Sequence, residues 1–321
     1  MITGGLFTRD FLTEGILSTP RWQALDENNV TAIRDKAAAL FAKLAQIRNP
    51  SEPVTEKDLI YPLLAAIGWA DRVFVQPNAS VKGRADVPDA LLFADEDAHA
   101  RARQEWNDWQ RFKHGLCVVE AKSWNRLLDR VENSKEAAEG VPSTQMLRYL
   151  RRADDVTEGR LRLGVLTNGR VWRLYWQGAL SVAEDFLEID LGKAFDLPGC
   201  EFDLLDRRPN SFADDGQWRA HAFKLFVTMF GPGAFIQQPD GHTFLDSARR
   251  EGKFWESRVA KSLSDSVFDW CFRALRAPSR RRTRNVRACS PSPISPKCGK
   301  RPYPALSATV RPLCRRSQSL A

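Results

Sequence analysis

The segment 115–124, Gly-Leu-Cys-Val-Val-Glu-Ala-Lys-Ser-Trp, constrains the fold of this 321-residue chain more than any other. Successive side chains of a β-strand point to opposite faces of its sheet. In residues 116–119 both alternating sets are apolar, which predicts a central strand in a sheet that is covered on both faces. The run then meets two charged residues, Glu120 and Lys122, which share one face because they lie two positions apart.

Helical and strand patterns alternate around this segment and predict an α/β fold. Residues 29–48 have apolar side chains at helical spacing, and a second helix is expected from Thr55 as N-cap, with a bend near Pro62, to Gly68. Asn168-Gly169 between two apolar runs predicts a β-hairpin. Further strands are predicted at 73–75, 90–93 and 186–191, and helices at 143–152 and within 217–272; residues 96–113 are expected to be an excursion between strands. This order predicts a mixed sheet flanked by helices.

Charge and composition change near residue 272. The chain carries 48 basic and 40 acidic residues, a net charge of +8, yet it has no Asp or Glu after Asp269. Residues 273–321 are rich in Arg, Pro and Ser, lack periodicity, and are predicted to be a disordered basic tail. We therefore expect an N-terminal helical segment at 1–52, a core domain at 53–195, a helical connector at 196–272, and the tail.

Several classes of protein are disfavoured by the sequence. The six cysteines form no Cys-x-x-Cys pair and the four histidines are scattered, so neither a zinc site nor a disulfide framework is expected. No apolar run approaches the roughly 20 residues that span a bilayer, and Arg9 and Asp10 stand where a signal peptide needs apolar residues. We expect a cytoplasmic protein with no membrane partner.

Two carboxylates and one ammonium are predicted to converge at one edge of the sheet. Asp89 begins the strand at 90–93, while Glu120 and Lys122 end the strand at 116–122. Paired carboxylates raise each other's pKa unless a cation lies between them, and Mg²⁺ suits such oxygen ligands. Asp89, Glu120 and the backbone carbonyl of Ala121 would hold the metal for phosphodiester hydrolysis, and Lys122 would orient or help deprotonate the attacking water. Asp86 is an alternative first carboxylate, because it precedes the same apolar run.

These residues resemble the PD-(D/E)xK nuclease superfamily, as Pro88-Asp89 and Glu120-Ala121-Lys122. Gln145 and Tyr149 match the Q-x-x-x-Y motif of one branch of that superfamily, and their four-residue spacing places them on one helical face. The resemblance implies a restriction-endonuclease-like fold, Gln145 in the catalytic set, and Glu56 as a further acid at the metal site.

Structural interpretations compete with the functional ones. Glu120 and Lys122 could form an exposed ion pair of little worth. Glu56 could be only a partner of the helix dipole, and Tyr149 only a core residue.

A narrower resemblance covers about residues 5 to 272. These residues are similar to the N-terminal part of single-chain type IIG restriction-modification enzymes, in the segments LFTRDFLTEGI, VVEAKSWNRLLDR, PSTQMLRYLRRADD and LTNGRVWRLYWQGALSVAEDFLEIDL. The resemblance implies a Mg²⁺-dependent, site-specific endonuclease that cuts double-stranded DNA.

The chain departs from that family after about residue 272. A methyltransferase and a target-recognition domain would follow there, but this sequence has no Asn-Pro-Pro-Tyr or Asp-Pro-Pro-Tyr motif and no glycine-rich cofactor loop. We expect a truncated or frameshifted chain, whose Arg-rich tail is either an out-of-frame product or a DNA-binding segment. The alternative function is a catalytically silent remnant or DNA-binding module that retains the nuclease fold.

Overall fold

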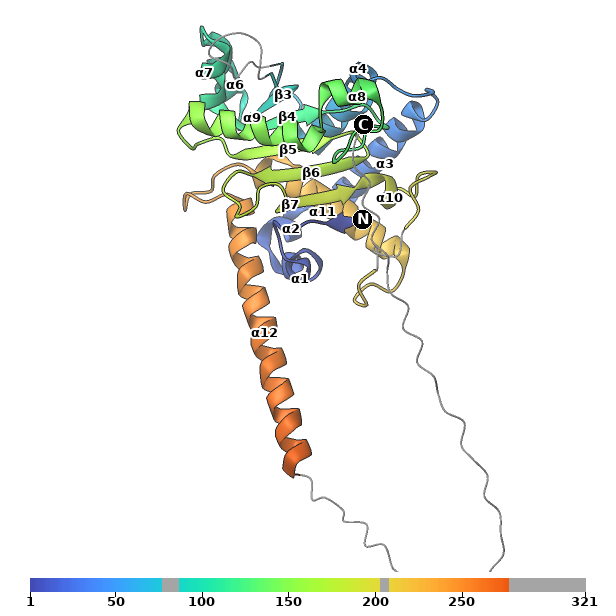
Figure 1. The fold of residues 1–321 in the computed structure, drawn as a ribbon, viewed down its shortest axis with the longest axis vertical. Coiled ribbons are helices and arrows are strands. Elements are labelled where there is room, and N and C mark those ends of the chain that lie inside the picture. The colour runs from blue at the N-terminus through green and yellow to red at the C-terminus, as the bar shows by residue number, and fades with distance from the viewer. Residues whose placement is uncertain (77–86, 203–207, 277–321) are drawn as a thin grey trace, which may run out of the picture. The chain divides into compact units, whose positions relative to one another are not determined.

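The computed structural model describes residues 1–76, 87–202 and 208–276, and within them the predicted α/β fold is confirmed (Figure 1). The described residues contain one seven-stranded sheet in the order β1-β7-β6-β5-β4-β3-β2. Strands β4 and β5 are parallel, and every other neighbouring pair is antiparallel. The strands are β1 (Ile2–Thr3), β2 (Val73–Val75), β3 (Ala90–Phe93), β4 (Gly115–Ala121), β5 (Leu163–Thr167), β6 (Val171–Trp176) and β7 (Phe186–Asp190).

Helices precede, interrupt and follow the strands. The N-terminal ones are α1 (Arg9–Thr13), η1 (Gly15–Ser18), α2 (Pro20–Ala24), α3 (Glu27–Leu44), α4 (Glu52–Thr55), η2 (Glu56–Ile60), α5 (Tyr61–Leu64) and η3 (Ala65–Trp69). Those between strands are α6 (Glu96–Gln104), α7 (Asp108–Arg111), η4 (Phe112–His114), α8 (Ser134–Glu139) and α9 (Pro142–Thr157). The last are α10 (Leu191–Ala194), α11 (Asp215–Phe230), η5 (Pro232–Ala234) and α12 (Phe244–Arg276). No helix within the described residues is long and apolar enough to cross a membrane.

Strand β4 lies inside the sheet, as its apolar pattern predicts. Cys117 and Val119 face a core built with helices α3, α5 and α11, and both are fully buried. Val118 faces the opposite core, where Met146 and Leu150 of α9 cover the sheet. Helix α9 also connects β4 to β5, which is the kind of crossover that two parallel strands require.

The compact unit Met1–Asp269 contains all of the strands described. Its larger core draws residues from three of the predicted segments, such as Phe41 from 1–52, Trp172 from 53–195 and Phe226 from 196–272. Of the predicted tail, α12 includes residues up to Arg276, and 277–321 lie outside the described residues.

The helix before the strands begins earlier than predicted. Ser51, and not Thr55, precedes its first residue, Glu52, so the prediction of Thr55 as N-cap is wrong. Pro53 explains the earlier start, because proline is accommodated in the first helical turn, where its missing N–H costs nothing. The hydroxyl of Thr55 instead donates to the Ser51 carbonyl at 2.9 Å. The predicted end is confirmed at Gly68, whose φ of 108° is outside the helical range.

The Asn168-Gly169 hairpin is confirmed by the antiparallel pairing of β5 with β6. Gly169 has a φ of 85°, and Asn168 Oδ1 accepts hydrogen bonds from the amides of Arg170 and Val171 at 3.1 and 2.8 Å. The Asn168 amide group also donates to the Arg126 carbonyl at 2.9 Å. The turn therefore joins the hairpin to the loop that follows β4.

A substitution of Trp172 tests the packing of the core on the α11 side of the sheet. Its side chain is 0% exposed, packs against Phe226 and Phe230, and donates from Nε1 to the Gly169 carbonyl at 2.9 Å. We expect Trp172→Ala to lower the free energy of unfolding by about 3 to 5 kcal/mol in urea denaturation. The matched control is Trp106→Ala, where the side chain is 93% exposed and the expected change is within about 0.5 kcal/mol. Equal losses in the two variants would contradict this description of the core.

Candidate active site

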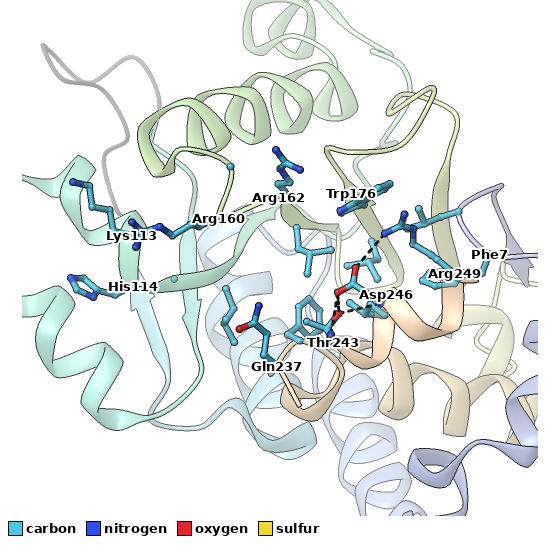
Figure 2. A pocket seen from close by; sticks show the side chains of 18 residues that line it. Phe7, Lys113, His114, Arg160, Arg162, Trp176, Gln237, Thr243, Asp246 and Arg249 are labelled. Carbon is cyan, nitrogen blue, oxygen red and sulfur yellow. Dashed lines mark hydrogen bonds and ion pairs between the residues drawn. The ribbon is translucent and has the colours of Figure 1, made fainter. Parts of the chain in front are cut away.

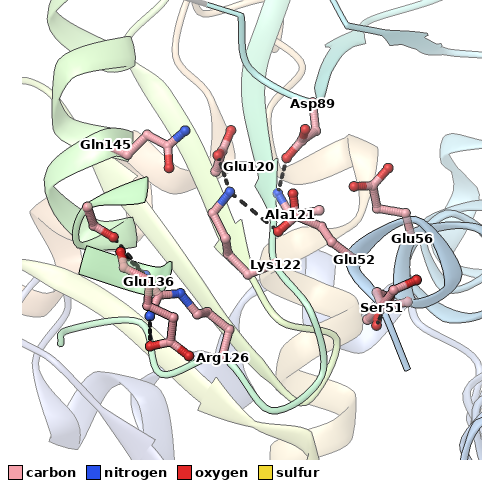
Figure 3. A network of polar contacts seen from close by, with 12 residues as sticks. Ser51, Glu52, Glu56, Asp89, Glu120, Ala121, Lys122, Arg126, Glu136 and Gln145 are labelled. Carbon is pink, nitrogen blue, oxygen red and sulfur yellow. Dashed lines mark hydrogen bonds and ion pairs between the residues drawn. The ribbon is translucent and has the colours of Figure 1, made fainter. Parts of the chain in front are cut away.

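The predicted carboxylates and ammonium come together at the end of strand β4 (Figure 3). Because β3 is antiparallel to β4, the start of β3 lies beside the end of β4, with Ala90 opposite Val119. Asp89, immediately before β3, therefore reaches the same edge of the sheet as Glu120 and Lys122. The alternative first carboxylate, Asp86, lies outside the described residues.

Asp89 is fixed by the backbone of β4. Its Oδ2 accepts a hydrogen bond from the amide of Ala121 at 2.7 Å. Ala121, predicted as a carbonyl ligand, thus contributes its N–H to the site by holding a carboxylate in place. Its carbonyl as a metal ligand stays a prediction.

Glu120 and Lys122 form a buried ion pair. The Lys122 ammonium donates to Glu120 Oε1 at 2.5 Å, and the two residues are 8% and 1% exposed, respectively. Glu52 Oε2 lies 3.7 Å from the same ammonium. The interpretation of Glu120 and Lys122 as an exposed ion pair is therefore wrong, since both side chains lie inside the protein.

Three carboxylates form a group that could hold a metal ion. Glu52 and Glu56, from the helix before the strands, and Asp89 each offer one oxygen, and these oxygens lie within 4.8 Å of one another. Oxygen ligands of this kind suit hard divalent cations. The Tyr61 hydroxyl donates to Glu56 Oε2 at 3.3 Å and orients that carboxylate.

Glu52 was not predicted from the sequence. The signal was its position four residues before Glu56, which places both on one helical face. With Thr55 as the predicted N-cap, Glu52 falls outside the helix, so its four-residue spacing from Glu56 carries no meaning. Glu56 was predicted for this site, whereas Glu120 lies outside the group of three and contacts Lys122; Glu120 as a metal ligand stays a prediction.

The site carries more negative than positive charge, and this excess adds to burial in raising the pKa values of two of its acids. Burial, and then the charges of Asp89 and Glu52, raise the pKa of Glu56 to about 7. Burial and the charge of Asp89 raise the pKa of Glu120 to about 8, and burial raises the pKa of Asp89. A bound divalent cation would favour the ionised forms, so these residues fit a metal.

Lys122 remains an ammonium in the metal-free site. Burial alone would lower its pKa, but the negative charges of Glu120 and Glu52 outweigh burial and raise the pKa above its ordinary value. A protonated Lys122 can donate hydrogen bonds and offset negative charge, but it cannot accept a proton.

Gln145 and Tyr149 lie on one face of α9, as predicted. Gln145 lies on the Glu120 side of the site (Figure 3). The Gln145 side chain donates to the Tyr149 hydroxyl at 2.7 Å. Burial and the charge of Glu120 raise the pKa of Tyr149, so the phenol stays neutral and hydrogen-bonding. Tyr149 is buried and joins Gln145 to the surroundings of Glu120.

The loop after Lys122 is anchored by Arg126. This buried guanidinium pairs with Glu136 of α8 and donates to the carbonyl of Gly140 at 2.7 Å. The Arg126 carbonyl accepts from Asn168, as described above. The backbone that follows Lys122 is therefore tied both to α8 and to the β5–β6 turn.

Protonation of this site should make the stability of the metal-free protein depend on pH. Unfolded glutamates have pKa values near 4.5, so between about pH 5 and 8 the folded protein binds protons that the unfolded chain has released. Stability should therefore fall as the pH rises through this range. Thermal unfolding in EDTA should show a falling midpoint for the wild type and a flatter profile for Glu56→Gln. The control is the exposed Glu184→Gln; profiles of equal slope in all three proteins would contradict the assignment.

Comparison of the chain with protein-family models, curated proteins and solved structures found no match. Function is therefore inferred from the residues of this site.

Proposed function

We propose that the chain is a Mg²⁺-dependent endonuclease domain that hydrolyses phosphodiester bonds of double-stranded DNA. The observation that carries the proposal is the convergence of Asp89, Glu120 and Lys122 from neighbouring strands, next to the group formed by Glu52, Glu56 and Asp89. The resemblance of Pro88-Asp89 and Glu120-Ala121-Lys122 to the PD-(D/E)xK motif supports the same reaction.

The metal ligands in this proposal are Glu52, Glu56 and Asp89. A divalent ion bound there supplies positive charge to a phosphate oxygen and lowers the pKa of bound water. Every side-chain ligand is a carboxylate, which suits Mg²⁺ as it does other hard divalent cations.

Lys122 is the cationic side chain of the site, and its proposed role is to stabilise charge on the phosphate. Its ammonium would offset the negative charge that develops on the phosphate, and Glu120 holds that ammonium in place. Gln145, on the α9 side, would act as a neutral donor near the phosphate or the attacking water. Deprotonation of that water by Lys122 is not favoured in the metal-free site, because the carboxylates keep Lys122 protonated.

The biological setting follows from the narrower resemblance. We place the domain in the cytoplasm, within a restriction-modification enzyme of type IIG, where a methyltransferase and a target-recognition domain would supply modification and sequence specificity. The basic tail would add DNA affinity that does not depend on sequence. A silent DNA-binding remnant with the same fold is the outcome to be distinguished by experiment.

Nicking of supercoiled plasmid in the presence of Mg²⁺ tests the reaction. We expect Lys122→Met and Asp89→Asn to lower the nicking rate by about a hundredfold or more, because each removes a charge that contacts the reacting groups. The controls are Lys36→Met and Asp35→Asn, which change exposed residues of the same types. Equal nicking by all five proteins would reject the catalytic proposal, and binding of DNA without nicking by the wild type would favour the silent remnant.

Metal binding can be tested without DNA. Titration with Mn²⁺, followed by the loss of the free-ion signal in electron paramagnetic resonance, should detect one bound ion that Mg²⁺ displaces. Glu52→Gln and Glu56→Gln should each weaken binding at least tenfold, as removal of a ligand charge does, while Glu184→Gln should not. Retention of full affinity by Glu52→Gln would exclude Glu52 from the site.

A further inference from the structure

A cavity lies at the start of strand β4, the end opposite to the carboxylates. Figure 2 shows the side chains that line it. Its volume is about 580 Å³. Gly115 and Leu116 at the start of β4, Leu163 at the start of β5 and Trp176 at the end of β6 contribute to its walls. The segment before α1 and the first turns of α12 complete it, so the cavity lies within the unit Met1–Asp269. Its volume is in the range of small-molecule sites in proteins.

The cavity is lined by an excess of positive charge. Lys113, Arg160, Arg162 and Arg249 line it, against a single carboxylate, Asp246. Asp246 is already engaged, because it accepts from the Thr243 hydroxyl at 2.7 Å and lies 3.4 Å from Arg249. The positive charge of the wall is therefore only partly neutralised by the protein.

The three arginines are held differently. Arg249 lies over the ring of Trp176, with its guanidinium carbon 3.1 Å from the ring centroid. Arg162 donates to Asp154 at 2.8 Å, which fixes it above the cavity. Arg160 is exposed and forms no ion pair with any part of the chain that the structure describes. Arg160 is thus free to bind an anion.

The floor of the cavity is apolar. Leu116, Leu163, Leu174, Phe235 and Leu245 contribute to the lining, beside the indole of Trp176. An inorganic anion would leave this apolar surface uncovered, whereas an apolar molecule would leave Arg160 without a partner. The combination suits a ligand with a flat, apolar ring at one end and an anionic group at the other.

We propose that this cavity binds a nucleotide, with its phosphates on Arg160 and Arg162 and its base on the apolar floor. A guanidinium fork matches the geometry of phosphate oxygens. A free nucleotide is favoured over a DNA strand because the site is a cavity, separated from the carboxylates by the length of β4, roughly 20 Å for a strand of this kind. The site is distinct from the proposed nuclease centre and does not depend on it.

Isothermal titration of the full chain with ADP in EDTA tests the proposal. EDTA removes divalent ions, so the carboxylates of the other site repel the phosphates. We expect saturable binding that weakens at least about tenfold in Arg160→Gln and in Arg162→Gln, since each loses charge-assisted hydrogen bonds to phosphate. The matched control is Arg151→Gln, an exposed arginine of α9 outside the cavity lining, which should bind as the wild type does.

Further titrations distinguish this cavity from the carboxylate site and from a site for phosphate alone. Duplex DNA should not displace ADP, so failure of the nuclease proposal would leave this one intact. Adenosine and inorganic phosphate should each bind at least about tenfold more weakly than ADP, because each fills only half of the site. The proposal is overturned by absent ADP binding, by equal affinity for phosphate and ADP, by equal loss in Arg151→Gln, or by displacement of ADP by duplex DNA.

Discussion

The ion pair between Glu120 and Lys122 is the interaction on which the rest of the site depends. Removing two charges from water costs several kcal/mol for each ion unless good geometry and further partners compensate. Strand β4 imposes that cost, because its apolar residues on both faces place its last residues inside the protein. The 2.5 Å contact between the two groups and the Glu52 carboxylate 3.7 Å from the ammonium are the compensation that the chain provides. The burial of strand β4 and the pairing of its charged residues therefore depend on each other.

The same strand joins two regions of opposite charge. Carboxylates gather at its last residues, and cationic side chains line the cavity at its first. A polyanion such as DNA would be repelled by the carboxylate end alone, so the DNA binding that we propose would require a cation there to reverse the local potential. The raised pKa of Glu56 expresses the same need in the metal-free protein, where a proton takes the place of that cation.

The sequence was sufficient where one local pattern determines the structure. Two apolar faces located β4, Asn168-Gly169 located the hairpin, and Gly68 ended a helix through its positive φ. Prediction from the sequence failed where two local signals compete. Thr55 with acidic followers resembles a helix start, but Pro53 is also favourable in a first turn, and this second signal prevails and brings Glu52 into the site. The arginine-lined cavity could not be predicted, because its lining comes from segments far apart in the chain that only the folded sheet brings together.

Glu52 also links metal binding to the state of Lys122. In the metal-free site the ammonium is shared between Glu120 at 2.5 Å and Glu52 at 3.7 Å. If Glu52 turns its charge to a divalent ion, as proposed, Lys122 loses the weaker of its two partners while Glu120 still holds it in place. The charges that raise its pKa are reduced at the same time, because a nearby cation opposes protonation. Metal binding would thus weaken the ionic attraction between Glu52 and Lys122 and bring the ammonium closer to giving up its proton, which connects the proposed electrostatic role of Lys122 with the base role that the sequence suggested.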